Sequence, residues 1–146
     1  MFKPVSGSPN LARMEYVADA STAFGAGNLA YRDTSTGELK EMTATVGDVT
    51  TLECIIAEDV TTAASNPVVE GTPIYDGMLV IADCTNNTAA NQLNKAHLLT
   101  DAGTVNNTDT HSADVNAVFI ALRQVGAASE KKLLGRLALR LGQVAA

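Results

Sequence analysis

Residues 109–114 combine Asp, Ser and His in one short segment, which makes them the part of the sequence closest to a catalytic or metal-binding cluster. Neighbouring residues of one loop rarely hold a nucleophile, a base and an orienting acid in line, so the segment does not predict a catalytic triad. Asp109, His111 and Asp114 also lack the regular oxygen-ligand spacing and the central Gly of a calcium loop. We interpret the segment as a solvated loop.

The other residues that could do chemistry stand alone. The second histidine, His97, lies in a half-apolar stretch and is predicted to pack rather than to bind a ligand. Glu58 and Asp59 end a predicted strand, where a pair of carboxylates is normally hydrated. No Gly-rich phosphate-binding pattern occurs in the sequence. We therefore expect no catalytic residues and no cofactor, and we expect that the protein is not an enzyme.

Cys54 and Cys84 are the only cysteines. They do not form a CxxC motif, and two thiols cannot complete a structural zinc site without other ligands. Both lie in or beside apolar runs, which predicts two free, buried thiols and no metal site.

Length and composition indicate one folded domain. The chain has 146 residues, of which 46% are hydrophobic, and it contains no Trp, three Phe and three Tyr, so its core must be mostly aliphatic. No segment reaches the roughly 18 apolar residues needed to span a bilayer. The first residues lack the apolar core of a signal peptide. We expect synthesis in a cytoplasm and no contact with a membrane.

The charge of the chain is unevenly distributed. The net charge is −6, which argues against a nucleic-acid-binding surface. Residues 115–146 nevertheless carry five basic residues against one acidic residue, a balance of +4, so the first 114 residues carry −10. The basic residues are Arg123, Lys131, Lys132, Arg136 and Arg140. This segment is interpreted either as a solvated basic edge or as a docking face for an acidic partner.

Residues 1–13 are predicted to form an extended arm that precedes a domain of residues 14–146. Two prolines, one glycine and two serines interrupt regular strand pairing in this segment. Phe2, Val5 and Leu11 are spaced along it as apolar anchors. We expect these three side chains to bind a neighbouring protein, and removal of the arm to leave the domain folded.

Short strands bounded by turn residues dominate the rest of the sequence. A hairpin is predicted from residues 28–32 and 38–42, joined by a turn in which Gly37 can take a positive φ. Alternation also predicts strands at 14–19 and 52–57, and the apolar runs at 78–82 and 117–122 predict buried central strands. The fold class is therefore mainly β, a small barrel or sandwich of short antiparallel strands with an extended N-terminal arm.

Three segments give a less regular pattern. Residues 88–98 have the apolar spacing of a short helix, and residues 104–114 are polar enough for an exposed loop. Leu133, Leu137 and Leu141 recur every four residues, which fits a helix, whereas residues 137–141 alternate Leu with Ala138 and Arg140, which fits a strand. We favour the strand because Gly135 and Gly142 bracket it.

The order of these strands and turns, over roughly residues 14–140, resembles that of the head decoration (cement) proteins of tailed bacteriophages. The segments that carry the resemblance are a Gly-containing step into a strand at 24–31, a turn and strand at 36–40, a strand with an acidic turn at 54–60, and a Pro- and Gly-containing turn before a buried strand at 68–82.

The resemblance implies a protein that sits on the outside of an assembled capsid in the virion and bridges subunits of the major capsid protein. It also implies a homo-oligomer, with a trimer favoured. In that case the arm, together with Arg136 and Arg140, would face the shell. Two alternatives are a tail or baseplate component and a small carbohydrate-binding β-domain. The latter normally needs aromatic platforms, of which this chain has few.

Overall fold

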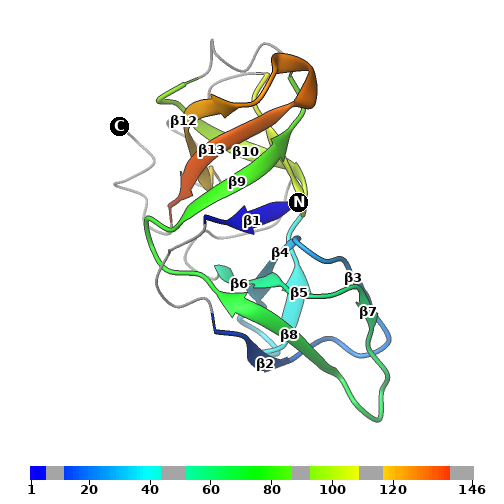
Figure 1. The fold of residues 1–146 in the computed structure, drawn as a ribbon. Coiled ribbons are helices and arrows are strands. Elements are labelled where there is room, and N and C mark those ends of the chain that lie inside the picture. Colours follow the sequence, from blue (N-terminus) through cyan, green and yellow to red (C-terminus); the bar gives the residue numbers. More distant parts are fainter. Residues whose placement is uncertain (6–11, 44–51, 87–92, 109–116, 139–146) are drawn as a thin grey trace.

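Strands make up most of the computed structural model, which describes residues 1–5, 12–43, 52–86, 93–108 and 117–138. Within these ranges the single helix is a short 3-10 helix, η3 (Ala128–Glu130). The strands form two lobes, drawn one above the other in Figure 1. The mainly β fold predicted from the sequence is therefore confirmed.

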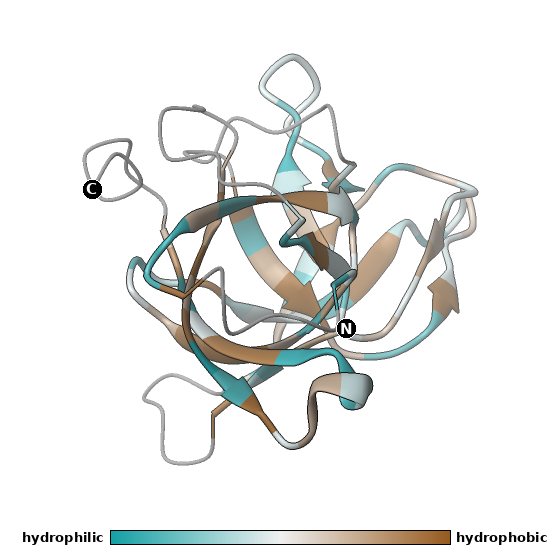
Figure 2. Cartoon of the chain, turned by 90° about the horizontal axis from the view of Figure 1, so that it is seen from above, coloured by the Kyte–Doolittle hydropathy of each residue, from teal (hydrophilic) through white to brown (hydrophobic). Residues whose placement is uncertain are grey.

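The upper lobe is a closed barrel. Its sheet has the order β1-β9-β11-β10-β12-β13, and β13 also pairs with β9, which closes the ring. Seen from above, these strands run around a common centre (Figure 2). The strands are β1 (Phe2–Pro4), β9 (Leu79–Cys84), β10 (Ala96–Asp101), β11 (Thr104–Asn106), β12 (Phe119–Val125) and β13 (Lys132–Leu137).

The lower lobe is a curled sheet that closes at one point only. Its order is β2-β8-β6-β4-β5, and a separate two-stranded ladder joins β3 to β7. The outer strands meet at a single parallel bridge between Ala18 and Leu39, where the Asp19 N–H donates to the Leu39 carbonyl oxygen over 3.0 Å. The strands are β2 (Met14–Val17), β3 (Ala23–Phe24), β4 (Leu29–Arg32), β5 (Leu39–Glu41), β6 (Leu52–Ile56), β7 (Val60–Thr61) and β8 (Val68–Pro73).

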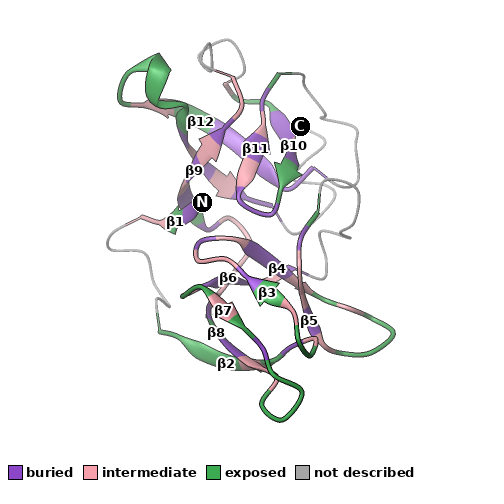
Figure 3. Cartoon of the chain, turned by 90° about the vertical axis from the view of Figure 1, so that its right-hand side faces the viewer, coloured by how far each residue is buried: buried purple, intermediate pink, exposed green. Residues whose placement is uncertain are grey.

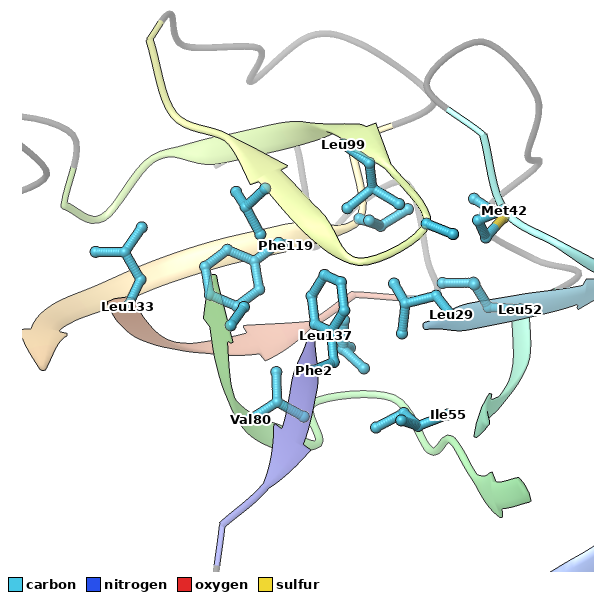
Figure 4. Close-up of a cluster of buried hydrophobic side chains, with 14 of the residues drawn as sticks. Phe2, Leu29, Met42, Leu52, Ile55, Val80, Leu99, Phe119, Leu133 and Leu137 are labelled. Atoms are coloured by element: carbon cyan, nitrogen blue, oxygen red, sulfur yellow. The ribbon is translucent and has the colours of Figure 1, made fainter. Parts of the chain in front are cut away.

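One hydrophobic core joins the two lobes. In Figure 4, Phe2, Phe119 and Leu137 from the upper barrel face Leu29 and Ile55 from the lower sheet. A second cluster fills the inside of the lower lobe, on the opposite face of the same lower sheet. Because β4 and β6 contribute side chains to both clusters, the position of the lower sheet against the barrel is set by apolar packing.

Alternation sends neighbouring residues of each strand to opposite clusters, and a β-bulge in β6 adjusts this pattern at Leu52. Ala30 pairs with Cys54 but Tyr31 pairs with Leu52, so Glu53 is an extra residue in the strand. The extra residue puts Leu52 on the face that packs against the upper barrel, whereas Cys54 points into the lower lobe.

Several predicted elements are confirmed. The hairpin of β4 and β5 is present, with Gly37 at φ +75°. The two apolar runs form β9 and β12, both central in the barrel. In the C-terminal segment the strand lies earlier than predicted: β13 includes Gly135 and ends at Leu137, where the predicted strand begins, and residues 139–141 lie outside the described part.

Two predictions in the middle of the chain are wrong where they can be compared. Residues 96–98 of the predicted helix belong to β10, and residues 104–106 of the predicted loop form β11. Both segments pair with barrel strands far along the chain, so tertiary hydrogen bonding overrides local pattern. Residues 88–92 of the predicted helix and residues 109–114 of the predicted loop lie outside the described residues.

The prediction of an arm outside the sheet is wrong for the first residues. Residues 2–4 form β1, which pairs with β9, and Phe2 is only 1% exposed. Its ring packs edge-on against Phe119 at a centroid distance of 6.3 Å. Pro4 is tolerated because the bonds to β9 are made by its odd-numbered neighbours, such as Val5 N–H to the Leu79 carbonyl over 3.1 Å. A proline with its nitrogen directed away from the ladder removes no sheet hydrogen bond.

Candidate protein-binding surface

The outer face of the upper barrel carries an aliphatic strip at its centre. Alternation along β9 turns Val80 and Ala82 into the core and leaves Leu79 and Ile81 outside. On the neighbouring strand β13, Leu134 faces outward directly opposite Ile81. Leu79 is one of the few large apolar residues that is exposed, at 39%.

Basic side chains surround this strip. Lys3 of β1 pairs with Ile81, Arg123 of β12 pairs with Leu134, and Arg136 of β13 pairs with Leu79. Directly opposed residues on one face of a sheet have neighbouring side chains. We call this surface the basic face; it consists of Lys3, Leu79, Ile81, Asp83, Arg123, Lys132, Leu134 and Arg136.

Asp83 is the one carboxylate of the basic face, and it is already neutralised. Its side chain accepts hydrogen bonds from Lys132 Nζ at 2.6 Å and from the Met1 amino group at 3.0 Å. Burial raises the pKa of the Asp83 carboxyl, but these two positively charged donors outweigh it, so that the pKa lies below its ordinary value. Asp83 therefore stays ionised, and the basic face contains four basic side chains and one acidic side chain.

The two lobes differ in charge. Among described residues, the upper lobe (1–5, 77–86, 93–108 and 117–138) has six basic and three acidic side chains, a net +3. The lower lobe (12–43 and 52–76) has three basic and ten acidic side chains, a net −7. A charge separation of this size orients the protein in the field of a charged partner.

Of the five residues predicted to bind a partner, two lie on or beside the basic face, one is buried in the core, and two lie outside the described residues. Arg136 is half-buried within the basic face, and Val5 is half-buried beside Leu79 at its edge. The prediction that Phe2 binds a partner is wrong, because its side chain is buried in the core and cannot contact another protein from there. Leu11 and Arg140 lie outside the described residues. Sequence reasoning missed Lys3, which was assigned to a free arm, and the outward positions of β9, which were treated as a buried run.

Potential metal ligands are dispersed over the described part of the chain. This part holds no group of three or more His, Cys, Asp or Glu residues that could bind a metal ion, and no helix in it is long and apolar enough to cross a membrane. His97 is fully buried in β10. A hollow of about 470 Å³ lies between the lobes; of its two carboxylates, Glu41 accepts a hydrogen bond from the side chain of Asn28 at 3.0 Å and Asp101 accepts one from the Gly103 N–H at 2.8 Å.

Both cysteines are free and buried, as predicted, one in each lobe. Burial, together with the charge of Glu53, raises the pKa of the Cys54 thiol to about 12. Burial likewise raises the pKa of the Cys84 thiol. A thiol with a raised pKa is a poor nucleophile at neutral pH, so neither cysteine has the properties of a reactive site.

No family model and no curated protein matches the sequence of this chain. Among solved structures, the chain is similar to the head fiber gp8.5 N base of bacteriophage phi29. The likeness covers 88% of this chain and 96% of that chain, with a TM-score of 0.51 and 12% sequence identity. At this identity the likeness concerns the fold alone. The two-lobed β-structure described above is thus a fold that also occurs in the base of a phage head fiber.

Proposed function

We propose that this chain is a structural protein of a bacteriophage particle that binds the outside of the head and stabilises contacts between subunits of the major capsid protein. The observation that supports this most directly is the shared fold with the phi29 head fiber base, a protein that belongs to a phage head. The sequence resemblance to head decoration proteins points to the same part of a virion.

The basic face supplies a physical means of attachment. Protein interfaces combine a desolvated apolar centre with a charged rim, and complementary charge increases both the association rate and the specificity. Here Leu79, Ile81 and Leu134 form the centre, and Lys3 and Arg123 stand on the rim. The proposed counterpart is an acidic patch with aliphatic side chains on the major capsid protein.

In this orientation the upper lobe faces the shell and the acidic lower lobe faces outward. Val5 and Arg136 belong to the docking surface, and Leu11 and Arg140 are further predicted contacts. A homotrimer would engage several capsid subunits at once and thereby increase its hold through effective concentration.

Binding to purified heads that lack the protein tests this proposal. We expect Arg123→Glu and, separately, Arg136→Glu to weaken co-sedimentation with heads, more at low salt than at high salt, because exposed charges are screened within about 8–10 Å at physiological ionic strength. Lys95→Glu is the matched control, since Lys95 is an exposed cation of the same lobe outside the basic face. Attachment unaffected by either reversal would remove the basic face from the contact.

Electron microscopy of native particles tests the location itself. We expect density for the protein on the outer surface of the head, with its upper lobe inward. Density on the tail or baseplate would assign the protein there, and its absence from particles would overturn a role in the virion altogether.

A further inference from the structure

Apart from the bridge between Ala18 and Leu39, the described ranges show no strand paired with the outer edge of the lower sheet at β2. β2 is the first strand of the sheet, pairs on one side with β8, and has no strand paired along its other side in the described ranges. Ala18, just after β2, meets Leu39 at the single bridge that closes the lobe. Figure 3 shows β2 as the most exposed strand of the lower lobe.

The direction of the backbone groups along β2 follows from the register. The Ala18 N–H donates to the Pro67 carbonyl over 2.7 Å, so in an antiparallel ladder Tyr16 and Met14 also direct their N–H groups toward β8. Glu15 and Val17 alternate with them, so their N–H groups point away from β8. These are the donors that an added strand would use.

Apolar side chains and two hollows accompany this edge. Met14 is 54% exposed and Val17 is 61% exposed, more than any other described large apolar residues except Met1. A hollow of about 290 Å³ adjoins Met14 and is bounded by Pro73, Ile74 and Tyr75. A second hollow, of about 230 Å³, adjoins Val17 and is bounded by Arg32 and Leu39. The first hollow lies toward the end of β8, whereas the second lies toward β5 and has room for a side chain of a strand lying along the outer edge of β2.

The charge beside the edge is negative. Glu15 lies directly opposite Glu70 on β8, an arrangement that costs stability because like charges on opposed positions repel. Arg13 is the cation near them, 3.9 Å from Glu70, and it is shared with Glu58 at 3.1 Å. Two carboxylates thus share one guanidinium, and Glu15 adds a third negative charge beside them, which leaves an attraction for added positive charge.

We propose that the outer edge of β2 binds an extended, basic segment of another protein, which adds a strand to the lower sheet. In this mode of recognition the main-chain hydrogen bonds provide affinity, and pockets for alternate side chains provide specificity. A second copy of this chain fits less well, because pairing β2 with β2 would bring together two copies of Glu15 and two lobes of net −7. This edge is on the lobe that carries none of the basic face, so binding here is independent of attachment to a head.

The test uses the full chain and a capped peptide of alternating Val and Lys residues as the probe. We expect the peptide to shift the amide resonances of Glu15 and Val17 in a saturable manner. A matched peptide with Glu in place of Lys is expected to bind at least about fivefold more weakly, since it replaces attraction with repulsion. Equal binding of both peptides, or no shift at these two amides at millimolar peptide, would overturn the proposal.

Two variants separate edge pairing from general charge attraction. Val17→Pro removes an outward N–H without removing a bond to β8, and we expect it to abolish binding; Val17→Thr keeps the N–H and the branched side chain and should bind as the parent does. Glu15→Lys should weaken binding of the Lys peptide about fivefold or more. Circular dichroism checks that each variant is folded.

If Val17→Pro fails to fold, the same question is answered by a Lys peptide that is N-methylated at every residue and therefore cannot form a regular ladder along either of its edges. We expect the methylated peptide not to bind. Binding equal to that of the unmethylated peptide would overturn strand addition. A concentration-dependent dimer that Val17→Thr retains and Val17→Pro loses would identify a second copy as the occupant and would overturn the basic segment.

Discussion

The two lobes of this protein use strands of similar length but complete their sheets differently. In the upper lobe β9 is paired on both edges, with β13 on one side and with β1 and β11 on the other. In the lower lobe the outer strands meet at one bridge, between Ala18 and Leu39. A closed barrel exposes the face of a sheet, whereas an open sheet also exposes an edge. The lobes therefore present two kinds of binding surface, and their opposite charges favour different partners.

The largest loss of stability is expected from a substitution in β1, the first strand of the upper lobe. Phe2→Ala removes a ring that is 1% exposed and packs against Phe119 at the centre of the shared core. We expect a loss of about 3–5 kcal/mol in the free energy of unfolding. Urea denaturation measures it, with Lys3→Ala as the matched control because Lys3 lies on the same strand and is exposed. A loss below about 1 kcal/mol would mean that β1 contributes little to the core and that the first residues behave as an arm.

A glycine in each lobe permits a close approach between neighbouring strands. A Cβ at Gly135 in the barrel would collide with the Phe119 ring and lie 2.5 Å from the Ile120 carbonyl oxygen. A Cβ at Gly71 in the lower sheet would lie 2.6 Å from the Cys54 sulfur. We expect each Gly→Ala variant to cost about 1–3 kcal/mol, with the larger cost at Gly135, because its nearest backbone oxygen lies at 2.5 Å whereas that of Gly71 lies at 3.1 Å.

A second substitution should reduce the cost of the glycine replacement in the lower lobe but not in the upper lobe. Cys54→Ala removes the sulfur that obstructs position 71, so thermal unfolding should show that Gly71→Ala costs less in the Cys54→Ala background than in the parent. No side-chain replacement removes the Ile120 carbonyl near Gly135. Equal costs of Gly71→Ala in the two backgrounds would contradict the contact as the cause.

The pH dependence of stability should reveal the ion pair of the upper lobe. The folded pKa of Asp83 is lowered, so its contribution to stability is present above its unfolded pKa of about 3.9 and is lost as the pH falls through the folded value. Asp83→Asn should cost about 1 kcal/mol or less at neutral pH, because the pair with Lys132 is partly exposed. Unfolding curves of the parent and the variant should converge as the pH falls below the folded pKa of Asp83; a constant difference at all pH values would assign the effect to something other than this charge.

The smallest expected effect concerns the two thiols. With the pKa of Cys54 raised to about 12 and that of Cys84 also raised, neither thiol should react with a disulfide reagent at pH 8 while the protein is folded. Both should react after denaturation. Rapid reaction of one thiol in the native protein would show that its lobe opens locally, and mass spectrometry would identify which one.

Much of the fold could be predicted from the sequence because it depends on local pattern. The hairpin at residues 29–41 requires a positive φ at Gly37, and β9 and β12 are short apolar runs that only buried strands accommodate. The strands β1, β10 and β11 could not be predicted in this way. Their residues are polar, or contain Pro, or repeat with the spacing of a helix, and they become strands because a barrel strand distant in the sequence supplies their hydrogen-bond partners.

The candidate binding surfaces likewise have some features that the sequence determines and others that only the folded structure determines. The sequence by itself determined that the chain is acidic overall and that basic residues gather near its C-terminal end, because charge can be counted along a chain. It did not determine that Lys3 would join Arg123 and Arg136 around an aliphatic strip, since that depends on β1 and β13 both pairing with β9. Nor could it determine that β2 keeps an open edge. Whether a sheet closes depends on the strand registers and on the packing of both lobes around one core, and these are properties of the folded chain alone.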